Sequence, residues 1–161
     1  MTALRPMPAE RFAAFAEESQ QAYADDNVLA GRWPEAGALQ QARAEFARLL
    51  PQGVATPGHR LYEILEKASG QCVGVLWLAL QQAGAERVGY VYNLRVGSAF
   101  RGRGHARAAM QLAEAEVLAA GGVRMALHVF GFNTSAQALY RSLGYGITGL
   151  NMAKPLRIPG A

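Results

Sequence analysis

Residues 100–107 form a glycine- and arginine-rich segment, Phe-Arg-Gly-Arg-Gly-His-Ala-Arg, at the junction of a predicted strand and a predicted helix. The first turn of a helix presents unpaired backbone N–H groups and the positive end of the helix dipole, so it suits an anion. Glycine lets the backbone approach a phosphate closely, and the arginines add positive charge. The pattern indicates a phosphate-binding loop; a solvated surface turn with a glycine cap is the alternative.

Two common nucleotide motifs are excluded at this loop. A dinucleotide fingerprint requires a third glycine at position 107, where this chain has Arg107. A Walker loop requires Gly-Lys followed by Ser or Thr, which residues 100–107 lack. Any phosphate bound at this loop would therefore belong to another class of ligand.

The elements that position this loop follow from apolar periodicity and from the placement of glycine and proline. Strands are predicted at 2–6, 61–66, 71–80, 88–96, 123–130 and 147–152, and helices at 8–30, 34–50, 104–120 and 133–143. This order predicts an α/β fold with a mixed, mostly antiparallel central sheet flanked by helices. Within 88–96, strict alternation places Tyr90 and Tyr92 on the same face as Leu94.

Composition limits the class of protein. The 161 residues predict a single domain over 1–161, and 51% hydrophobic with only 17% charged residues excludes a disordered chain. The single cysteine, Cys72, lies in an apolar run and is expected to be a buried thiol. No multi-cysteine metal site is possible, and no metal is expected. No apolar run reaches membrane-spanning length and no secretory signal is visible, so a soluble cytoplasmic protein is expected.

Two motifs in order resemble the GNAT superfamily of N-acetyltransferases. The first resembles that family's acyl-CoA motif and consists of Val96 followed by Arg101-x-x-Gly104-x-Ala106. The second resembles its later signature and reads Asn133-x-x-Ala136-x-x-Leu139-Tyr140-x-x-x-Gly144-Tyr145. Together with the strand before the loop they cover residues 88–145. Where the family often has an Asp-Pro pair after the strand, this chain has Gly97-Ser98.

The resemblance implies how acetyl-CoA, the co-substrate, is bound. The strand ending at Leu94, Arg95 and Val96 would splay from its neighbour and pair its backbone with the pantetheine arm, as a strand adds to an open edge. The pyrophosphate would lie on the amides of Gly102, Arg103, Gly104, His105, Ala106 and Arg107, with the backbone of His105 mattering more than its ring. Arg101 and Arg103 can contact the nucleotide phosphates or point into solvent. Asn133 would both cap its helix and contact CoA.

The resemblance also implies a catalytic role for Tyr140, whose phenol would donate a proton to the departing CoA sulfur. The alternative is that Tyr140 belongs to an apolar stripe with Ala136, Leu139 and Leu143. Tyr23 and Trp33 are candidates for the wall of an amine-acceptor cleft, or for ordinary packing. Tyr90 and Tyr92 are candidates for a water relay there.

The general base is not identified by the sequence. The strand 88–96 carries no carboxylate, and Glu86 lies just outside it. His128 alternates away from Val123, Met125 and Leu127, but a lone histidine is more often structural than catalytic. Asp25 and Asp26 can bind a cationic acceptor or remain solvated, and His59 has no visible partner.

Three functions are compatible with these residues. The first is an enzyme that transfers an acetyl group from acetyl-CoA to a primary amine by direct attack in a ternary complex. The second is an acyl-CoA sensor that lacks catalysis. The third is a basic nucleic-acid-binding module, which the net charge of +4 permits but which has no recognition motif or aromatic platform beside its arginines. A homodimer is compatible with the resemblance, because dimers are common in that family.

Overall fold

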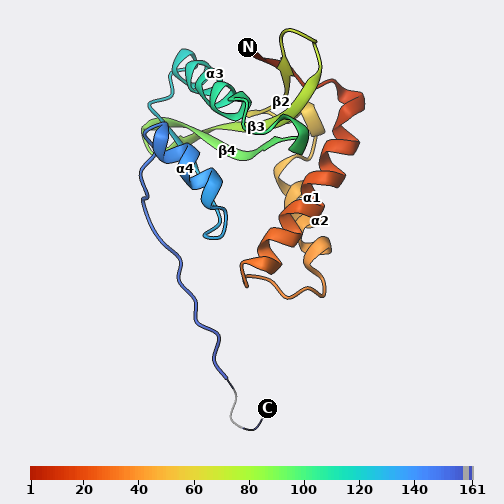
Figure 1. The fold of residues 1–161 in the computed structure, drawn as a ribbon, viewed down its shortest axis with the longest axis vertical. Helices are drawn as coiled ribbons and strands as arrows, with labels where there is room; N and C mark the ends of the chain where they lie inside the picture. The colour runs from red at the N-terminus through yellow and green to blue at the C-terminus, as the bar shows by residue number, and fades with distance from the viewer. Residues whose placement is uncertain (158–159, 161) are drawn as a thin grey trace.

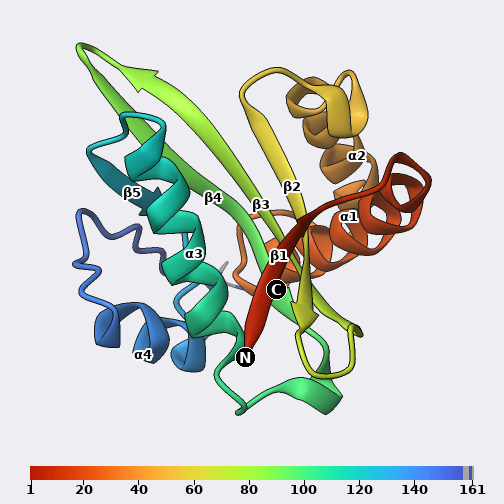
Figure 2. The same ribbon diagram turned by 90° about the horizontal axis from the view of Figure 1, so that it is seen from above.

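A computed structural model describes residues 1–157 and 160, and it contains a mixed five-stranded sheet with helices on both faces. Figures 1 and 2 show α3 over one face and α1 and α2 over the other. The strand order is β1-β2-β3-β4-β5, antiparallel throughout except for the parallel pair β4 and β5, which confirms the predicted fold class. The elements are β1 (Thr2–Pro6), α1 (Phe12–Leu29), α2 (Ala38–Leu49), β2 (His59–Glu66), β3 (Cys72–Ala83), β4 (Glu86–Val96), α3 (His105–Ala119), β5 (Arg124–Leu127) and α4 (Thr134–Ser142).

Each face of the sheet has its own apolar core. The core under α3 is built on Ile64, Leu76, Leu78 and Met110, which are completely buried. The core under α1 and α2 is built around Trp77, whose side chain is 1% exposed. On β3, Leu76 and Leu78 therefore lie in the core under α3, and Trp77 between them lies in the other core. This is expected because successive side chains of a strand point to opposite faces of the sheet.

A bulge in β4 changes which face its side chains occupy. The pairing with β3 passes from Leu78↔Val91 to Trp77↔Asn93, so Tyr92 is an extra residue. Tyr92 packs into the Trp77 core, and Asn93 also turns to that side, where its amide donates to Ser19 Oγ of α1 at 3.0 Å. Leu94 instead packs against the α3 core. The prediction that Tyr90 and Tyr92 share a face with Leu94 is therefore wrong, because strict alternation fails at the bulge.

Several predicted elements also differ in extent from those of the structure. Residues 147–152 form no strand, and the predicted strand 123–130 is shortened to β5 because its pairing with β4 ends at Leu127. The second helix begins at Ala38 rather than at Pro34, after a turn that reaches Gly37 with a φ of +83°. β4 begins at Glu86, so this carboxylate belongs to the strand and faces Arg124 Nε at 3.9 Å.

Among the described residues, no helix combines the length and apolar character that crossing a membrane requires.

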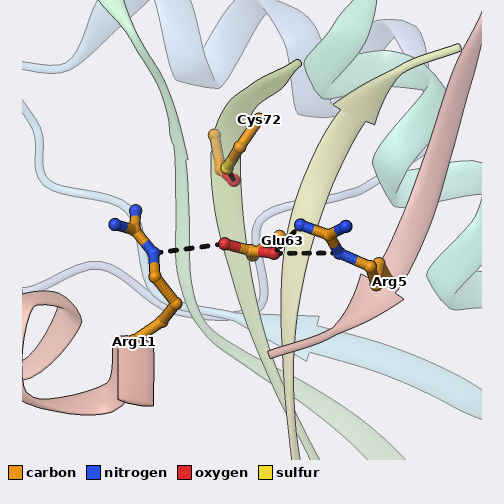
Figure 3. Close-up of polar contacts among 5 residues, drawn as sticks. Arg5, Arg11, Glu63 and Cys72 are labelled. Carbon is orange, nitrogen blue, oxygen red and sulfur yellow. Dashed lines mark hydrogen bonds and ion pairs between the residues drawn. The ribbon is translucent and has the colours of Figure 1, made fainter. Parts of the chain in front are cut away.

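A buried carboxylate joins β1, β2 and the turn before α1 (Figure 3). The Glu63 side chain is 3% exposed, and its Oε2 accepts from Arg5 Nη2 at 2.6 Å and Nε at 3.0 Å. Its Oε1 lies 3.3 Å from Arg11 Nε. A buried carboxylate is stable only when it is paired in this way. Cys72, drawn in the same view, is half-buried rather than fully buried, and its thiol donates to the Gly74 carbonyl oxygen at 3.4 Å.

Glu63→Gln should lower the free energy of unfolding by about 1–2 kcal/mol, because it removes the charge from hydrogen bonds to two guanidinium groups. The arginines are more than half exposed and regain hydration, which limits the loss. Urea denaturation measures the change. Glu17→Gln, at an exposed position of α1, is the control and should stay within about 0.5 kcal/mol. Equal stability of both variants would contradict this role for Glu63.

Candidate functional site

A cavity of about 480 Å³ lies where β4 and β5 part. Their register begins at Val88↔Arg124 and ends at Val91↔Leu127, so residues 92–96 of β4 have no β5 partner. The cavity is bordered by both strands, by α1 and α2, and by α4. A strand edge without a neighbour leaves N–H and C=O groups available to an extended ligand.

Nine of the candidate site residues considered in the sequence line this cavity: Tyr23, Asp26, Tyr90, Tyr92, Leu94, Arg95, His128, Asn133 and Tyr140. Trp33 does not line it; its ring packs edge-on against Tyr23 with centroids 5.2 Å apart, beside the small apolar cluster of α1 and α2. Val96 and the loop residues 101–107 also lie outside the lining set, and Val96 is buried in the α3 core.

Tyr140 comes to the cavity from α4. Its half-buried ring packs against the α3 core, so it belongs to an apolar stripe and lines the cavity at the same time. Burial raises the pKa of the Tyr140 phenol above its ordinary value. The phenol is therefore protonated at neutral pH and can act as a proton donor.

The loop before α3 keeps its backbone amides accessible. Gly102 and Gly104 have φ of +74° and +83°, and a Cβ at either would meet nothing within 4 Å. The N-cap of α3 is Gly104, which has no side chain to bond the N–H groups of the first turn. Exposed positive charge surrounds this turn. The geometry is that of an anion-binding helix terminus.

The side chains of this loop have separate contacts. Arg101 Nε donates to the Val96 carbonyl oxygen at 3.1 Å, and Arg103 lies over the Phe100 ring at 5.6 Å. Arg107 bonds Ser142 Oγ of α4. The ring of His105 is 5% exposed, with Nδ1 2.9 Å from Thr2 Oγ1, so it ties α3 to β1 and leaves only its backbone for a ligand.

Asn133 caps α4 as its sequence position predicts. Its Oδ1 accepts from the Ala136 backbone N–H at 3.2 Å, while the residue itself lines the cavity. The cap orients the helix that carries Tyr140.

Trp77 organises the aromatic wall of the cavity, and sequence reasoning missed it. Its indole N–H donates to His59 Nδ1 at 2.9 Å, and Tyr92 stacks on its ring with centroids 4.6 Å apart. Gln81 Nε2 donates to the Tyr92 hydroxyl at 2.9 Å. His59 therefore has a partner after all, across the β2–β3 pairing. In the sequence, Trp77 is a tryptophan within an apolar predicted strand, and such a residue is usually part of a core. Nothing local therefore pointed to its place in the cavity wall.

The outer part of the cavity carries groups of both charges, contributed by Asp26, Arg32, Glu45 and Arg48. Burial, then the nearby Asp25, raises the pKa of Asp26. Burial, then the charge of Glu45, raises the pKa of the Tyr23 phenol. Asp25 instead accepts a hydrogen bond from Gln21 on the helix surface and does not line the cavity.

His128 follows the last paired residue of β5 and lines the cavity. Its ring stands edge-on to Phe130 with centroids 4.8 Å apart, and Phe130 carries Arg32 over its face at 5.9 Å. Burial, and then the positive charge of Arg32, lower the pKa of His128. Its alternation away from Met125 and Leu127 was visible in sequence; its place in the cavity was not.

The described residues contain no cluster of three or more metal-ligating side chains.

The family model described as acetyltransferase (GNAT) family matches residues 14–145 of this chain. Two proteins of Bacillus subtilis are similar over 95% of this chain and 97% of their own length: the uncharacterized N-acetyltransferases YdgE, 32% identical, and YycN, 30% identical. The crystal structure of YycN superposes with a TM-score of 0.92 at 28% identity, covering 98% of this chain and 100% of YycN. AAC(6')-Iy, bound to a CoA-containing bisubstrate analog, shares the fold, with a TM-score of 0.63 at 15% identity and coverage of 98% and 99%.

The fold should lose stability as the pH falls through the ordinary histidine range. Burial lowers the pKa of both His59 and His128, so below about pH 6.5 the unfolded chain takes up protons that the folded chain does not. The free energy of unfolding therefore decreases on acidification, and His128→Gln should reduce that decrease. Urea denaturation at pH 7.5 and 5.5 measures both. An equal decrease in the variant would show that His128 titrates normally.

Proposed function

The chain belongs to the acetyltransferase (GNAT) family and is an acyl-CoA-dependent N-acetyltransferase, and from this premise we propose that it transfers an acetyl group from acetyl-CoA to a primary amine by direct attack in a ternary complex. The observation that carries the proposal is the open edge of β4 at residues 92–95, which have no β5 partner and line the same cavity as Tyr140. A covalent enzyme intermediate is not required, and Cys72 does not line the cavity.

The proposed path of acetyl-CoA follows the accessible backbone. The pyrophosphate lies on the free amides of the first turn of α3, where Gly102 and Gly104 leave room for it. The pantetheine arm adds to residues 94–96 of β4 as an extra strand. The thioester then reaches the cavity, where a backbone N–H of β4 can stabilise the oxyanion formed on attack. The CoA analog bound to AAC(6')-Iy supports this class of ligand for the shared fold.

Tyr140 is proposed as the proton donor. When the amine attacks the thioester carbonyl, a C–N bond forms and the C–S bond breaks, so the sulfur leaves with an electron pair that a proton must neutralise. The raised pKa of the Tyr140 phenol keeps that proton available at neutral pH. The thiol CoA is released with that proton, and the N–H proton that the nitrogen loses as the amide forms restores the phenol.

His128 is proposed as the proton acceptor that the sequence did not identify. An amine is almost wholly protonated at neutral pH and must lose a proton before it attacks. The lowered pKa of His128 keeps its imidazole neutral, and it lines the same cavity as Tyr140. The carboxylate of Glu86, at the far end of β4, does not line the cavity.

The acceptor is proposed to enter between α1, α2 and the loop after β5. Tyr23, Tyr90 and Tyr92 provide aromatic surface there, and Asp26 and Glu45 provide negative charge for an amine. The arginines in the same wall, Arg32 and Arg48, limit the attraction of a purely cationic acceptor.

Acetyl-CoA should raise the melting temperature of the protein, because a ligand that binds only the folded state stabilises it. In the presence of an amine panel, CoA thiol should be released, as measured with a thiol reagent. Stabilisation without turnover on any amine would support the acyl-CoA sensor instead. Salt-sensitive binding of DNA or RNA, with no effect of acetyl-CoA, would support the nucleic-acid-binding module.

Tyr140→Phe should lower kcat by roughly 10²-fold, the range of a general acid, with much less effect on acetyl-CoA affinity. Tyr145→Phe is the matched control: its hydroxyl donates to Glu114 at 2.9 Å, and it does not line the cavity. The control should lose some stability and retain its kcat. If Tyr140→Phe turns over at the wild-type rate, the phenol is not the proton donor.

A further inference from the structure

The outer part of the cavity carries two negative and two positive side chains, and the two signs differ in exposure. Asp26 and Glu45 are half-buried, whereas Arg32 and Arg48 are exposed. In the part of the chain that the structure describes, none of these four side chains belongs to an ion pair. The wall therefore offers a ligand negative charge in its more buried part and positive charge in its more exposed part.

The turn after α1 holds Arg32 at this wall. The Arg32 backbone N–H donates to the Asn27 carbonyl oxygen at 2.9 Å, and the Trp33 N–H donates to the same oxygen at 3.3 Å. The Trp33 ring packs edge-on against Tyr23, which fixes the turn against α1. The Arg32 guanidinium lies over the Phe130 ring at 5.9 Å. Arg32 is therefore held between α1 and the loop that follows β5.

The charge of Arg32 acts on two groups of the cavity that lie on different elements. Burial, then the charge of Glu45, raises the pKa of the Tyr23 phenol, and the charge of Arg32 opposes that rise. Burial, then the charge of Arg32, lowers the pKa of His128. Arg32 is thus within electrostatic reach of His128, the proposed proton acceptor. A group bound by Arg32 would lie close to the amine that His128 deprotonates.

We propose that the acceptor is a small amino carboxylate, whose amine is attracted by Asp26 and Glu45 and whose carboxylate is bound by Arg32. This substrate class rests on the proposed acetyl transfer and is a finer statement of it. A guanidinium presents parallel N–H donors that match the two oxygens of a carboxylate, and such charge-assisted bonds are stronger than neutral ones. A diamine would instead bring a second positive charge to Arg32, and like charges in contact are unfavourable.

Acetylation of matched amines tests the carboxylate. The panel is the series of ω-amino acids from glycine to ε-aminocaproate, the amide of each, and the diamine cadaverine. The series covers a range of separations between amine and carboxylate, and each amide removes only the negative charge. With acetyl-CoA in excess, kcat/KM is measured by release of CoA thiol and expressed per unprotonated amine, which removes differences in amine pKa.

At least one amino acid of the series should be acetylated about tenfold better than its amide, the range of a hydrogen-bonded charge pair. Cadaverine should be poorer than that amide. Arg32→Gln should bring the ratio of acid to amide close to one. Because both substrates are measured on the same variant, any effect of the substitution on His128 or on folding cancels in the ratio.

Arg43→Gln is the matched control. Arg43 is an exposed arginine of α2 that does not line the cavity, so its removal should leave the ratio unchanged. A ratio that survives Arg32→Gln would overturn the assignment of the carboxylate to Arg32.

Failure of the substrate class and failure of the proposed function give different results. If amides or cadaverine are acetylated as well as the amino acids at every chain length, the amino carboxylate is overturned and acetyl transfer stands. If acetyl-CoA raises the melting temperature but no amine of any kind releases CoA, the proposed function is overturned and the substrate class with it.

Discussion

The extra residue in β4 is the constraint on which the cavity depends. By inserting Tyr92 opposite the Trp77–Leu78 step of β3, the strand turns both Tyr92 and Asn93 to the face of α1 and α2. The pairing with β5 also ends at Val91, so in the described chain the edge of residues 92–96 that faces β5 has no strand neighbour, while residues 93–96 still pair with β3 on their other edge. Together, the bulge and the end of the β5 pairing supply the aromatic wall of the acceptor side and the open edge proposed for acetyl-CoA.

The two faces of the sheet are stabilised by different kinds of contact. The α3 face is closed by aliphatic packing and by the ring of His105, which ties the first turn of α3 to β1. The opposite face is fixed by buried polar contacts, Glu63 with two arginines and Trp77 with His59. Polar pairs of this kind specify geometry, because each group can be buried only with its partner in place.

The other side of β5 is the outer edge of the sheet. β5 has four residues and is the last strand of the sheet, so its outer edge has no strand neighbour in the described chain.

The sequence by itself determined the order of the elements as far as the last helix, the mixed sheet and the family, because periodicity, glycine placement and motif spacing are local properties. The phosphate-binding role of the loop before α3 stays a prediction. The sequence also placed Tyr140 and Asn133 on one helix. Its prediction of one domain over 1–161 stays a prediction. Only the tertiary structure decided that Leu94 faces away from Tyr92, that His128 and Trp77 border the cavity, and that residues 147–152 form no strand. A bulge and a strand edge are created by pairing between distant segments, and no local pattern encodes which partner is missing.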